Sequence, residues 1–254
     1  MRQIIDTHAH LCDPVFDPDR DQVLERAKNA GVAAVISVSE DLKDAERNMQ
    51  LAAEHPMIRP AAGLYPTHLD MKQAKEMHAF IRRHKDKLAA IGEVGLDFWV
   101  VKEESGREIQ REIFRSFIKL STELRLPLNV HSRSAGRHVV NALLEASAVK
   151  VQLHAFDGKF SAAMPAIEAG FFFSIPPSVA RSEQKQKLAK RLPLSNLLIE
   201  TDSPVLGSVP QERNEPANAR IAVKVIAELK GISEDEVMEA ASENTRCLYG
   251  KVFS

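Results

Sequence analysis

The sequence predicts an α/β fold, a (β/α)8 barrel with an additional C-terminal helix. Short apolar segments rich in β-branched residues alternate with longer segments of helical periodicity, which is typical of β-α-β units around a parallel sheet. Eight such strand segments can be counted, with seven helical segments between them. A length of 254 residues is usual for one such barrel, so we expect a single domain over residues 1–254. A doubly wound open sheet is the alternative arrangement.

The elements follow in order along the chain. The predicted strands are 3–8, 33–38, 58–63, 89–94, 127–131, 150–154, 171–175 and 197–201. Helical periodicity is clearest between them over 19–30, 45–54, 107–124, 136–146 and 184–190. Residues 203–216 contain three prolines and one glycine, which predicts a long loop of the kind that carries function. Helical periodicity resumes over 217–229, and Ser233 and Glu236 have the spacing of a capping box that begins a last helix toward Cys247.

The composition excludes several classes of protein. With 44% hydrophobic and 27% charged residues, the chain is typical of globular proteins and not of disordered or fibrous ones. No apolar run reaches the roughly 18 residues that a membrane span needs. The N-terminal segment reaches Asp6 before an apolar signal region could form. We therefore expect a cytoplasmic protein with no membrane association and no obligate protein partner.

Cysteine content and charge limit the chemistry further. Cys12 and Cys247 are the only cysteines and are far apart in sequence, which argues against a disulfide framework or a thiolate zinc cluster. A net charge of −1 argues against a protein that holds duplex DNA mainly through a basic face. A nucleic acid substrate would therefore be bound locally, as a single strand or at an end.

The first motif with chemical meaning is Asp6-Thr7-His8-Ala9-His10, at the end of the first predicted strand. Residues two apart in a strand face the same side, so His8 and His10 aim at one point. Two imidazoles make half of a site for a borderline transition metal. Two histidines at this spacing also occur by chance, so the pair gains significance only from residues further along the chain.

Four further potential ligands stand where other predicted strands end, namely Glu93, His131, His154 and Asp202. A single residue of this kind could be a structural histidine, a turn residue or a helix cap. In a barrel, however, these strand ends converge on one face, where such enzymes have their active sites. The presence of potential ligands at the same end of five predicted strands therefore predicts a metal site.

Six ligands exceed what one tetrahedral ion takes, so we expect two divalent metal ions, magnesium, manganese or zinc. We group His8, His10 and Asp202 around one ion and His131 and His154 around the other. Glu93 bridges both. Glu93 and Asp202 are the predicted catalytic residues, with Asp202 orienting the attacking water or taking its proton.

Polar residues two places before four of the ligands should face the barrel interior, and these are Asp6, Asn129, Gln152 and Glu200. Metal-bound histidines need an acceptor for their second ring nitrogen. We expect some of the four to accept these hydrogen bonds, Asp6 and Glu200 foremost. The residues between them should face the helices, and these are Val130, Val151, Leu153 and Ile199.

Residues near the ligands indicate a phosphate-containing substrate. Arg133 follows His131 by two residues, and Ser134 is expected to cap the next helix, which suits phosphate oxygens. A structural Arg133 paired with a carboxylate is the alternative. Lys159 and Arg213 are further candidates that could equally be solvated loop residues. The pattern as a whole predicts a metal-dependent phosphoester hydrolase.

The same residues resemble the ordered motif set of the TatD-type metal-dependent deoxyribonucleases of the amidohydrolase superfamily. The matching segments are 6–10, 92–98, 130–133, 154–158, 200–204 and 214–216. The resemblance implies a TIM barrel, two divalent metals, the six ligand roles given above, and nuclease activity typically on DNA, often as an exonuclease from the 3′ end. Tyr65 stands where the family commonly has histidine, and Ser134 where it often has aspartate. Both departures concern substrate contacts, so Tyr65 joins Arg133 and Arg213 as a candidate substrate-binding residue.

Two other functions compete with this interpretation. The first is a metal-dependent amidohydrolase or lactonase that acts on a small molecule. Many such enzymes bridge their metals with a modified lysine at the fourth strand, whereas Glu93 stands here. The second is a metal-binding protein without activity, which the complete ligand set and the potential base Asp202 disfavour.

Overall fold

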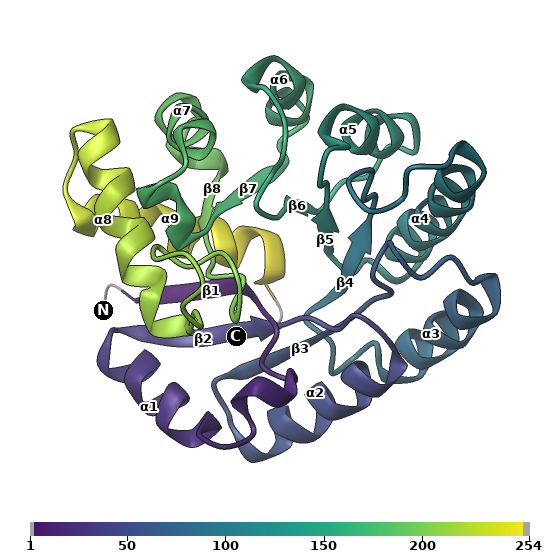
Figure 1. Ribbon diagram of the computed structural model, residues 1–254, viewed down its shortest axis with the longest axis horizontal. Coiled ribbons are helices and arrows are strands. Elements are labelled where there is room, and N and C mark those ends of the chain that lie inside the picture. Colours follow the sequence, from purple (N-terminus) through teal and green to yellow (C-terminus); the bar gives the residue numbers. More distant parts are fainter. Residues whose placement is uncertain (1–2, 251–254) are drawn as a thin grey trace.

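The computed structural model describes residues 3–250 of the chain. Eight parallel strands follow one another around a nearly closed barrel in sequence order (Figure 1). Their bounds are Ile4–Ala9 (β1), Val32–Ser37 (β2), Ile58–Ala62 (β3), Ala90–Gly95 (β4), Leu128–His131 (β5), Val151–Leu153 (β6), Phe172–Ile175 (β7) and Leu197–Ile199 (β8). The first and last strands meet beyond β8, where Ala9 and Ser203 form a parallel bridge and the N–H of Asp202 donates to the carbonyl of His8 at 2.8 Å. The predicted barrel is confirmed.

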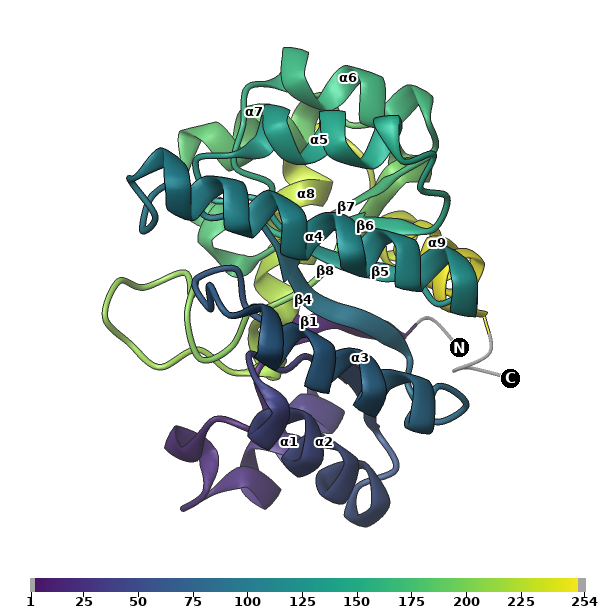
Figure 2. The ribbon, with the colours of Figure 1, turned by 90° about the vertical axis from the view of Figure 1, so that its right-hand side faces the viewer.

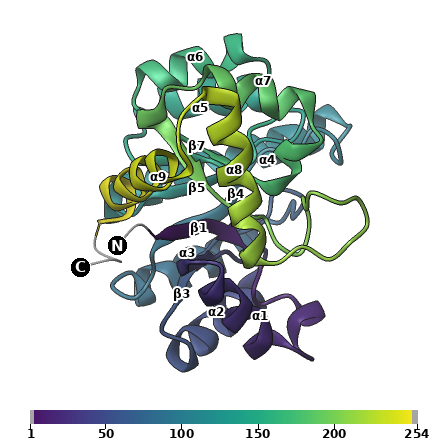
Figure 3. The same cartoon turned by 90° about the vertical axis from the view of Figure 1, so that its left-hand side faces the viewer.

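Helices surround the barrel on its outer side (Figure 1). Within residues 3–250 the α-helices are Arg20–Asn29 (α1), Leu42–Glu54 (α2), Met71–His84 (α3), Glu104–Leu124 (α4), Gly136–Glu145 (α5), Phe160–Glu168 (α6), Glu183–Arg191 (α7), Ala219–Lys230 (α8) and Glu234–Tyr249 (α9). None of them is long and apolar enough to cross a membrane. Figure 2 and Figure 3 show, from two sides, that α9 lies at the end of the barrel opposite to the long loop after β8.

The predicted elements agree closely with those observed. Every strand lies within two residues of its expected bounds. Helix α2 begins three residues earlier than predicted because the Asp41 side chain accepts a hydrogen bond from the N–H of Asp44 at 2.9 Å and caps the helix there. The capping box of Ser233 and Glu236 is present at the start of α9. Helices α3 and α6 occupy connections for which the periodicity indicates a helix but no bounds.

The strands direct apolar side chains outward and polar ones inward. Val130, Val151, Leu153 and Ile199 are fully buried in the core that the strands share with the surrounding helices. Asn129 from β5 and Gln152 from β6 instead donate across the barrel to the carbonyl of Thr7 in β1, at 3.0 and 3.3 Å. The two-residue period therefore places these polar residues inside the barrel, below the strand ends that carry the predicted ligands, as expected.

Helix α9 closes the other end of the barrel. Its last residue, Tyr249, is 3% exposed, and its hydroxyl donates to the side-chain oxygen of Gln152. The same hydroxyl accepts from the amide of Asn129 at 3.4 Å. The additional helix thus supplies a hydrogen-bond partner to two polar side chains of the barrel interior.

Candidate metal centre

The six predicted ligands converge at the C-terminal ends of the strands. They are His8 in β1, His10 just after it, Glu93 in β4, His131 at the end of β5, His154 after β6 and Asp202 after β8. Each is at most 8% exposed. Five of them, all except His8, border a cavity of about 530 Å³ together with neighbouring loops. The structure therefore brings together all six side chains from five different strands.

Glycines permit the close approach of the strands at this end. A Cβ on Gly63 would lie 2.5 Å from the carbonyl oxygen of Glu93. Gly95 has a φ of +149°, and a Cβ there would lie 2.1 Å from the carbonyl oxygen of His131. Glycine at these positions lets β4 lie directly against its neighbours while it carries Glu93 to the centre.

The carboxylate of Glu93 divides the ligands into two groups. Its Oε1 lies 2.6 Å from His131 Nδ1 and 2.7 Å from His154 Nε2. Its Oε2 lies 3.4 Å from His10 Nε2 and 3.6 Å from His8 Nε2. Asp202 Oδ1 completes this second group, at 3.3 Å from His8 Nε2 and 3.5 Å from His10 Nε2.

The donor atoms fit divalent metal. The facing nitrogens of His8 and His10 are 3.3 Å apart, and those of His131 and His154 are 3.2 Å apart. Two imidazole nitrogens this close direct lone pairs at each other unless a proton or cation lies between them. Three trios of ligand atoms lie within 4.8 Å of one another: His8 with His10 and Glu93, Glu93 with His131 and His154, and His8 with His154 and Asp202. Nitrogen and carboxylate oxygen donors suit borderline divalent ions.

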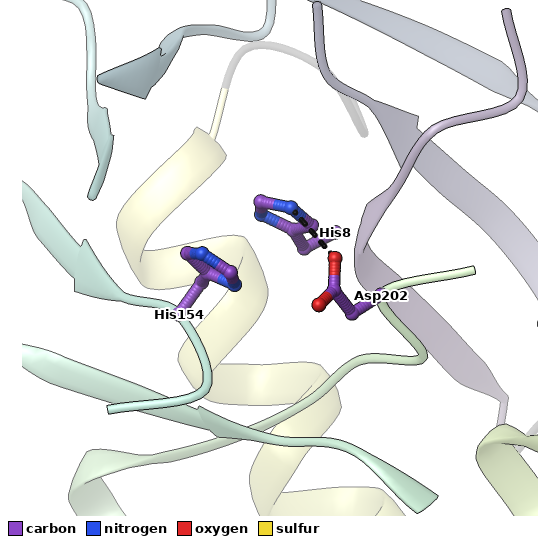
Figure 4. A group of neighbouring side chains, drawn as sticks. All are labelled: His8, His154 and Asp202. Atoms are coloured by element: carbon purple, nitrogen blue, oxygen red, sulfur yellow. Dashed lines mark ion pairs between the residues drawn. The ribbon is translucent and has the colours of Figure 1, made fainter. Parts of the chain in front are cut away.

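Figure 4 shows the third of these trios. The rings of His8 and His154 are stacked, with centroids 3.8 Å apart and an interplanar angle of 12°, and Asp202 lies beside them. His8, His154 and Glu93 each belong to two trios. The two groups around Glu93 are therefore one continuous cluster.

The second ring nitrogens of the histidines have different partners. His8 Nδ1 donates to the side-chain oxygen of Asn129 at 2.8 Å. His131 Nε2 donates to Asp97 Oδ2 at 3.1 Å. His154 Nδ1 has no hydrogen-bond partner within the described structure, with Glu200 Oε2 at 3.8 Å. These contacts fix the orientation of the His8 and His131 rings.

The expectation for Asp6 is wrong. Its carboxylate accepts from the backbone N–H of Thr201 at 2.9 Å and from the Thr201 hydroxyl at 2.5 Å, so it does not orient a histidine ring. It instead fixes the backbone just before Asp202, which has a φ of +54°. Asp97 has the role expected of Asp6. It follows Glu93 by four residues, beyond the end of β4, so the strand period that located the other polar residues does not reach it.

Charges within the cluster shift the pKa values of its members. Burial favours neutral forms, but the carboxylates of Asp202 and Glu93 outweigh it and raise the pKa of His10 to about 10. Burial lowers the pKa of His131, but the carboxylates of Glu93 and Asp97 outweigh this effect and raise that pKa to about 9. Burial and the nearby His8 lower the pKa of His154 to about 4. Against its burial, the neighbouring imidazoles hold the pKa of Glu93 well below its usual range. Protons thus balance the buried carboxylates in the absence of a cation.

The predicted substrate contacts divide into two sets. Tyr65 and Arg133 border the cavity, and the Tyr65 ring lies edge-on to His131 with centroids 5.0 Å apart. Arg213 is not among the residues that border it, and its guanidinium donates to Asp19 at 2.7 and 2.6 Å and to the carbonyl of Val15 at 3.0 Å. These contacts link the long loop to the segment just before α1.

Two further expectations concern the loops. Ser134 is not the cap of α5, which follows Ala135 without a side-chain cap. Ser134 lies one residue before the N-cap, with a φ of +55°, and its N–H donates to Asp157 Oδ2 at 2.7 Å. Lys159 is exposed and lies outside the residues that border the ligand cavity.

Lys185 is a cavity residue that the sequence reasoning missed. It lies in α7, and its ammonium donates to the carbonyl of Ala155, next to His154, at 3.1 Å. No sequence feature distinguishes it from Lys187 or Lys190 in the same polar helix. Only the packing of α7 against its neighbouring helices brings it to the cavity.

Comparison with known proteins finds a family model, relatives and a solved structure that all concern TatD-type proteins or metal-dependent hydrolases. A family model described as TatD related DNase matches residues 5–250. The human protein named deoxyribonuclease TATDN3 is 46% identical over 261 residues, covering 98% of this chain and 95% of that protein. The Bacillus subtilis protein named uncharacterized metal-dependent hydrolase YabD is 34% identical, covering 97% and 98% of the two chains. The crystal structure of YJJV, a TatD homolog from Escherichia coli, superposes with a TM-score of 0.91 at 27% identity, covering 98% and 99%.

Proposed function

Because the chain belongs to the TatD-related DNase family, we propose that it is a metal-dependent deoxyribonuclease that hydrolyses phosphodiester bonds in the cavity beside the six ligands. The geometry of Glu93 is the observation that carries this proposal. Its two carboxylate oxygens face two separate groups of donors, which is the arrangement expected of a ligand shared by two ions.

We assign His8, His10 and Asp202 to one ion and His131 and His154 to the other, with Glu93 between them. Divalent ions held there supply Lewis-acid charge that neutralises phosphoryl oxygens and make water a stronger nucleophile near neutral pH. The protein's own residues position these ions: Asn129 orients His8, and Asp97 orients His131.

Asp202 is the proposed proton acceptor. Against the effect of burial, hydrogen bonds from His10 and His8 hold the pKa of Asp202 far below its usual value, so it is ionised at neutral pH. Its ion pairs with both histidines use Oδ1, and we assign the proton-accepting role to Oδ2. As the water oxygen bonds to phosphorus, Asp202 takes a proton from the water, and the sugar oxygen leaves with the electron pair of the broken P–O bond and gains a proton from solvent to become the hydroxyl of the product.

The wall of the cavity suits a phosphate at the end of a strand. Arg133, Lys185 and Tyr65 border it, and the cationic groups of Arg133 and Lys185 can bind phosphate oxygens beside the metal centre. The volume of about 530 Å³ is in the range that holds one ligand of nucleotide size. With a net charge of −1, the chain has no excess of cations to hold a long duplex. These features support a single-stranded or terminal substrate and exonuclease action.

The test uses end-labelled single-stranded DNA and RNA with three preparations: the metal-loaded chain, the chain stripped with EDTA, and the metal-loaded Asp202→Asn variant. We expect shortening of the DNA from one end by the loaded chain, none after EDTA, and at least about a hundredfold slower cleavage by the variant. Asp86→Asn, an exposed carboxylate before β4, is the matched control and should cleave normally.

Equal cleavage by all three preparations would refute the proposed mechanism. Turnover of a lactone or cyclic amide, without cleavage of any nucleic acid, would establish the competing hydrolase class instead.

A further inference from the structure

The loop between β4 and α4 carries an exposed tryptophan next to the metal centre. Trp99 is 56% exposed and is the only tryptophan in the sequence. Among the exposed large apolar residues in 3–250 it is the only aromatic one, and Val100 beside it is 53% exposed. An exposed indole offers a large apolar face and an N–H donor, a combination enriched where proteins contact a partner.

The exposure of Trp99 is fixed by its surroundings. The N–H of Val100 donates to Asp97 Oδ1 at 2.8 Å, and the N–H of Val101 donates to the Asp97 carbonyl at 3.2 Å. On the other side, the N–H of Phe98 donates to the carbonyl of Arg133 at 3.0 Å. Asp97 also accepts from His131. One carboxylate therefore holds both a proposed metal ligand and the turn that presents the indole.

Two cations flank the indole. The ammonium of Lys102 lies 4.8 Å from the ring centroid, and the guanidinium carbon of Arg133 lies 5.3 Å from it. Arg133 is also part of the cavity wall beside His131. The aromatic face, the two cations and the cavity thus form one continuous surface, with Arg133 between the indole and the metal centre.

We propose that Trp99 is a stacking platform for the nucleobase next to the scissile phosphate, with Arg133 and Lys102 binding the phosphates on either side. The proposal rests on the proposed nuclease function and adds to it how the substrate is held. A base stacked on an indole gains more than an exposed cation–π contact does, so the base displaces the flexible Lys102 ammonium, which moves to a phosphate. Because every base has a π-face, such a platform holds a strand without selecting its sequence.

A nucleobase fits this surface better than a protein partner. The exposed apolar surface of the turn is confined to Trp99 and Val100, whereas a stable protein interface needs a surface of about 800 Å² on each partner. Two cations beside one exposed ring match the alternation of base and phosphate along a single strand.

The single tryptophan makes the test direct, since intrinsic tryptophan fluorescence reports on Trp99 alone. The magnesium-loaded chain is titrated with a short phosphorothioate oligonucleotide, which resists hydrolysis, and with an abasic oligonucleotide of the same length and charge. We expect saturable quenching by the base-bearing strand and little by the abasic one. Anisotropy of a labelled strand gives the affinity of the variants, which need no tryptophan signal.

Trp99→Ala should weaken binding of the base-bearing strand about tenfold. It should leave binding of the abasic strand unchanged, and Trp99→Phe should restore most of the affinity. Val149→Ala, a change at a 74% exposed residue before β6, is the matched control and should bind as the native chain does. On DNA, Trp99→Ala should raise KM more than it lowers kcat.

Binding and cleavage by the native chain with unquenched Trp99 fluorescence, or with equal affinity in Trp99→Ala, would overturn the platform and leave the nuclease function intact. Failure of the native chain to bind or cleave any oligonucleotide would overturn both proposals.

Discussion

Replacement of Asp97 by asparagine tests whether the metal centre depends on residues behind the ligands. Asp97 is fully buried and binds His131 Nε2 through Oδ2 and the N–H of Val100 through Oδ1. An asparagine side chain has nearly the same size, and its amide oxygen can keep the bond to Val100. The amide nitrogen, a donor, then faces the N–H of His131 Nε2, so the variant removes both the acceptor and the negative charge behind His131 and leaves the turn in place.

The expected loss follows from the bond that is removed. A hydrogen bond to a charged group contributes about 1.5–3 kcal/mol. Its loss corresponds to roughly a 10- to 150-fold loss of affinity. Removal of such supporting partners in other metal sites costs about 10- to 100-fold. We therefore expect the ion bound by His131 and His154 to be held at least about tenfold more weakly.

Isothermal titration of the metal-free chain with zinc or manganese checks this expectation. Two ions bound with different affinities give a two-step isotherm, and Asp97→Asn should shift one step and leave the other unchanged. Asp86→Asn serves as the control for loss of an exposed carboxylate. Two unshifted steps would refute the role given to Asp97, and a shift of both would contradict the assignment of His131 to one ion only.

Three further predictions concern protons, packing and the loop. At pH 7 the metal-free chain holds protons on His10 and His131, whose pKa values are raised to about 10 and about 9, so metal binding should release protons and strengthen as the pH rises toward 9. Because these pKa values exceed the ordinary 6.5, the stability that they give the metal-free fold is complete below about pH 6.5 and is lost as the pH rises through 9 to 10. Calorimetry in buffers of different ionisation enthalpy measures the protons, and an enthalpy independent of buffer would refute this. Gly95→Ala should lower the free energy of unfolding in urea by about 2 kcal/mol or more and abolish metal binding, because its Cβ meets the His131 carbonyl at 2.1 Å. Gly170→Ala, at a φ of +78° with open space, should cost only about 1 kcal/mol, and equal losses would show that strain in φ alone is responsible. Arg213→Ala should leave metal affinity and abasic-strand binding unchanged while proteolysis of the long loop becomes faster, since Asp19 no longer holds that loop; a loss of metal affinity would return Arg213 to the site.

The strand ends could be predicted because two local signals coincide there. Apolar runs identify the strands, and the first polar residues after each run mark where it leaves the sheet. In a parallel barrel all such ends face one way, so the order of the chain alone brings His8 and Asp202 together across 194 positions of sequence. The polar interior followed from the same period, with Asn129 as the observed partner of His8.

Residues that reach the centre from outside the strands could not be found in this way. Asp97 lies in a turn, where no period applies, and Lys185 lies on a helix whose rotation is fixed only by packing against its neighbours. Arg213 is the opposite case, a predicted substrate contact that lies outside the cavity. A loop arginine looks the same in sequence whether it meets a phosphate or a carboxylate, and Asp19 is 194 residues away. Long-range pairing of this kind depends on the folded chain.

The additional C-terminal helix illustrates how the barrel makes a buried metal centre possible. A barrel with polar side chains inside must satisfy them, since an unpaired buried polar group costs about 1–3 kcal/mol. From the floor, Tyr249 of α9 bonds to Gln152 and Asn129, and Asn129 in turn bonds to His8 Nδ1. The hydroxyl at the end of α9 is therefore two hydrogen bonds from a proposed ligand. These bonds couple the position of the helix to the orientation of the His8 ring. The helix therefore supports the metal site as well as the fold.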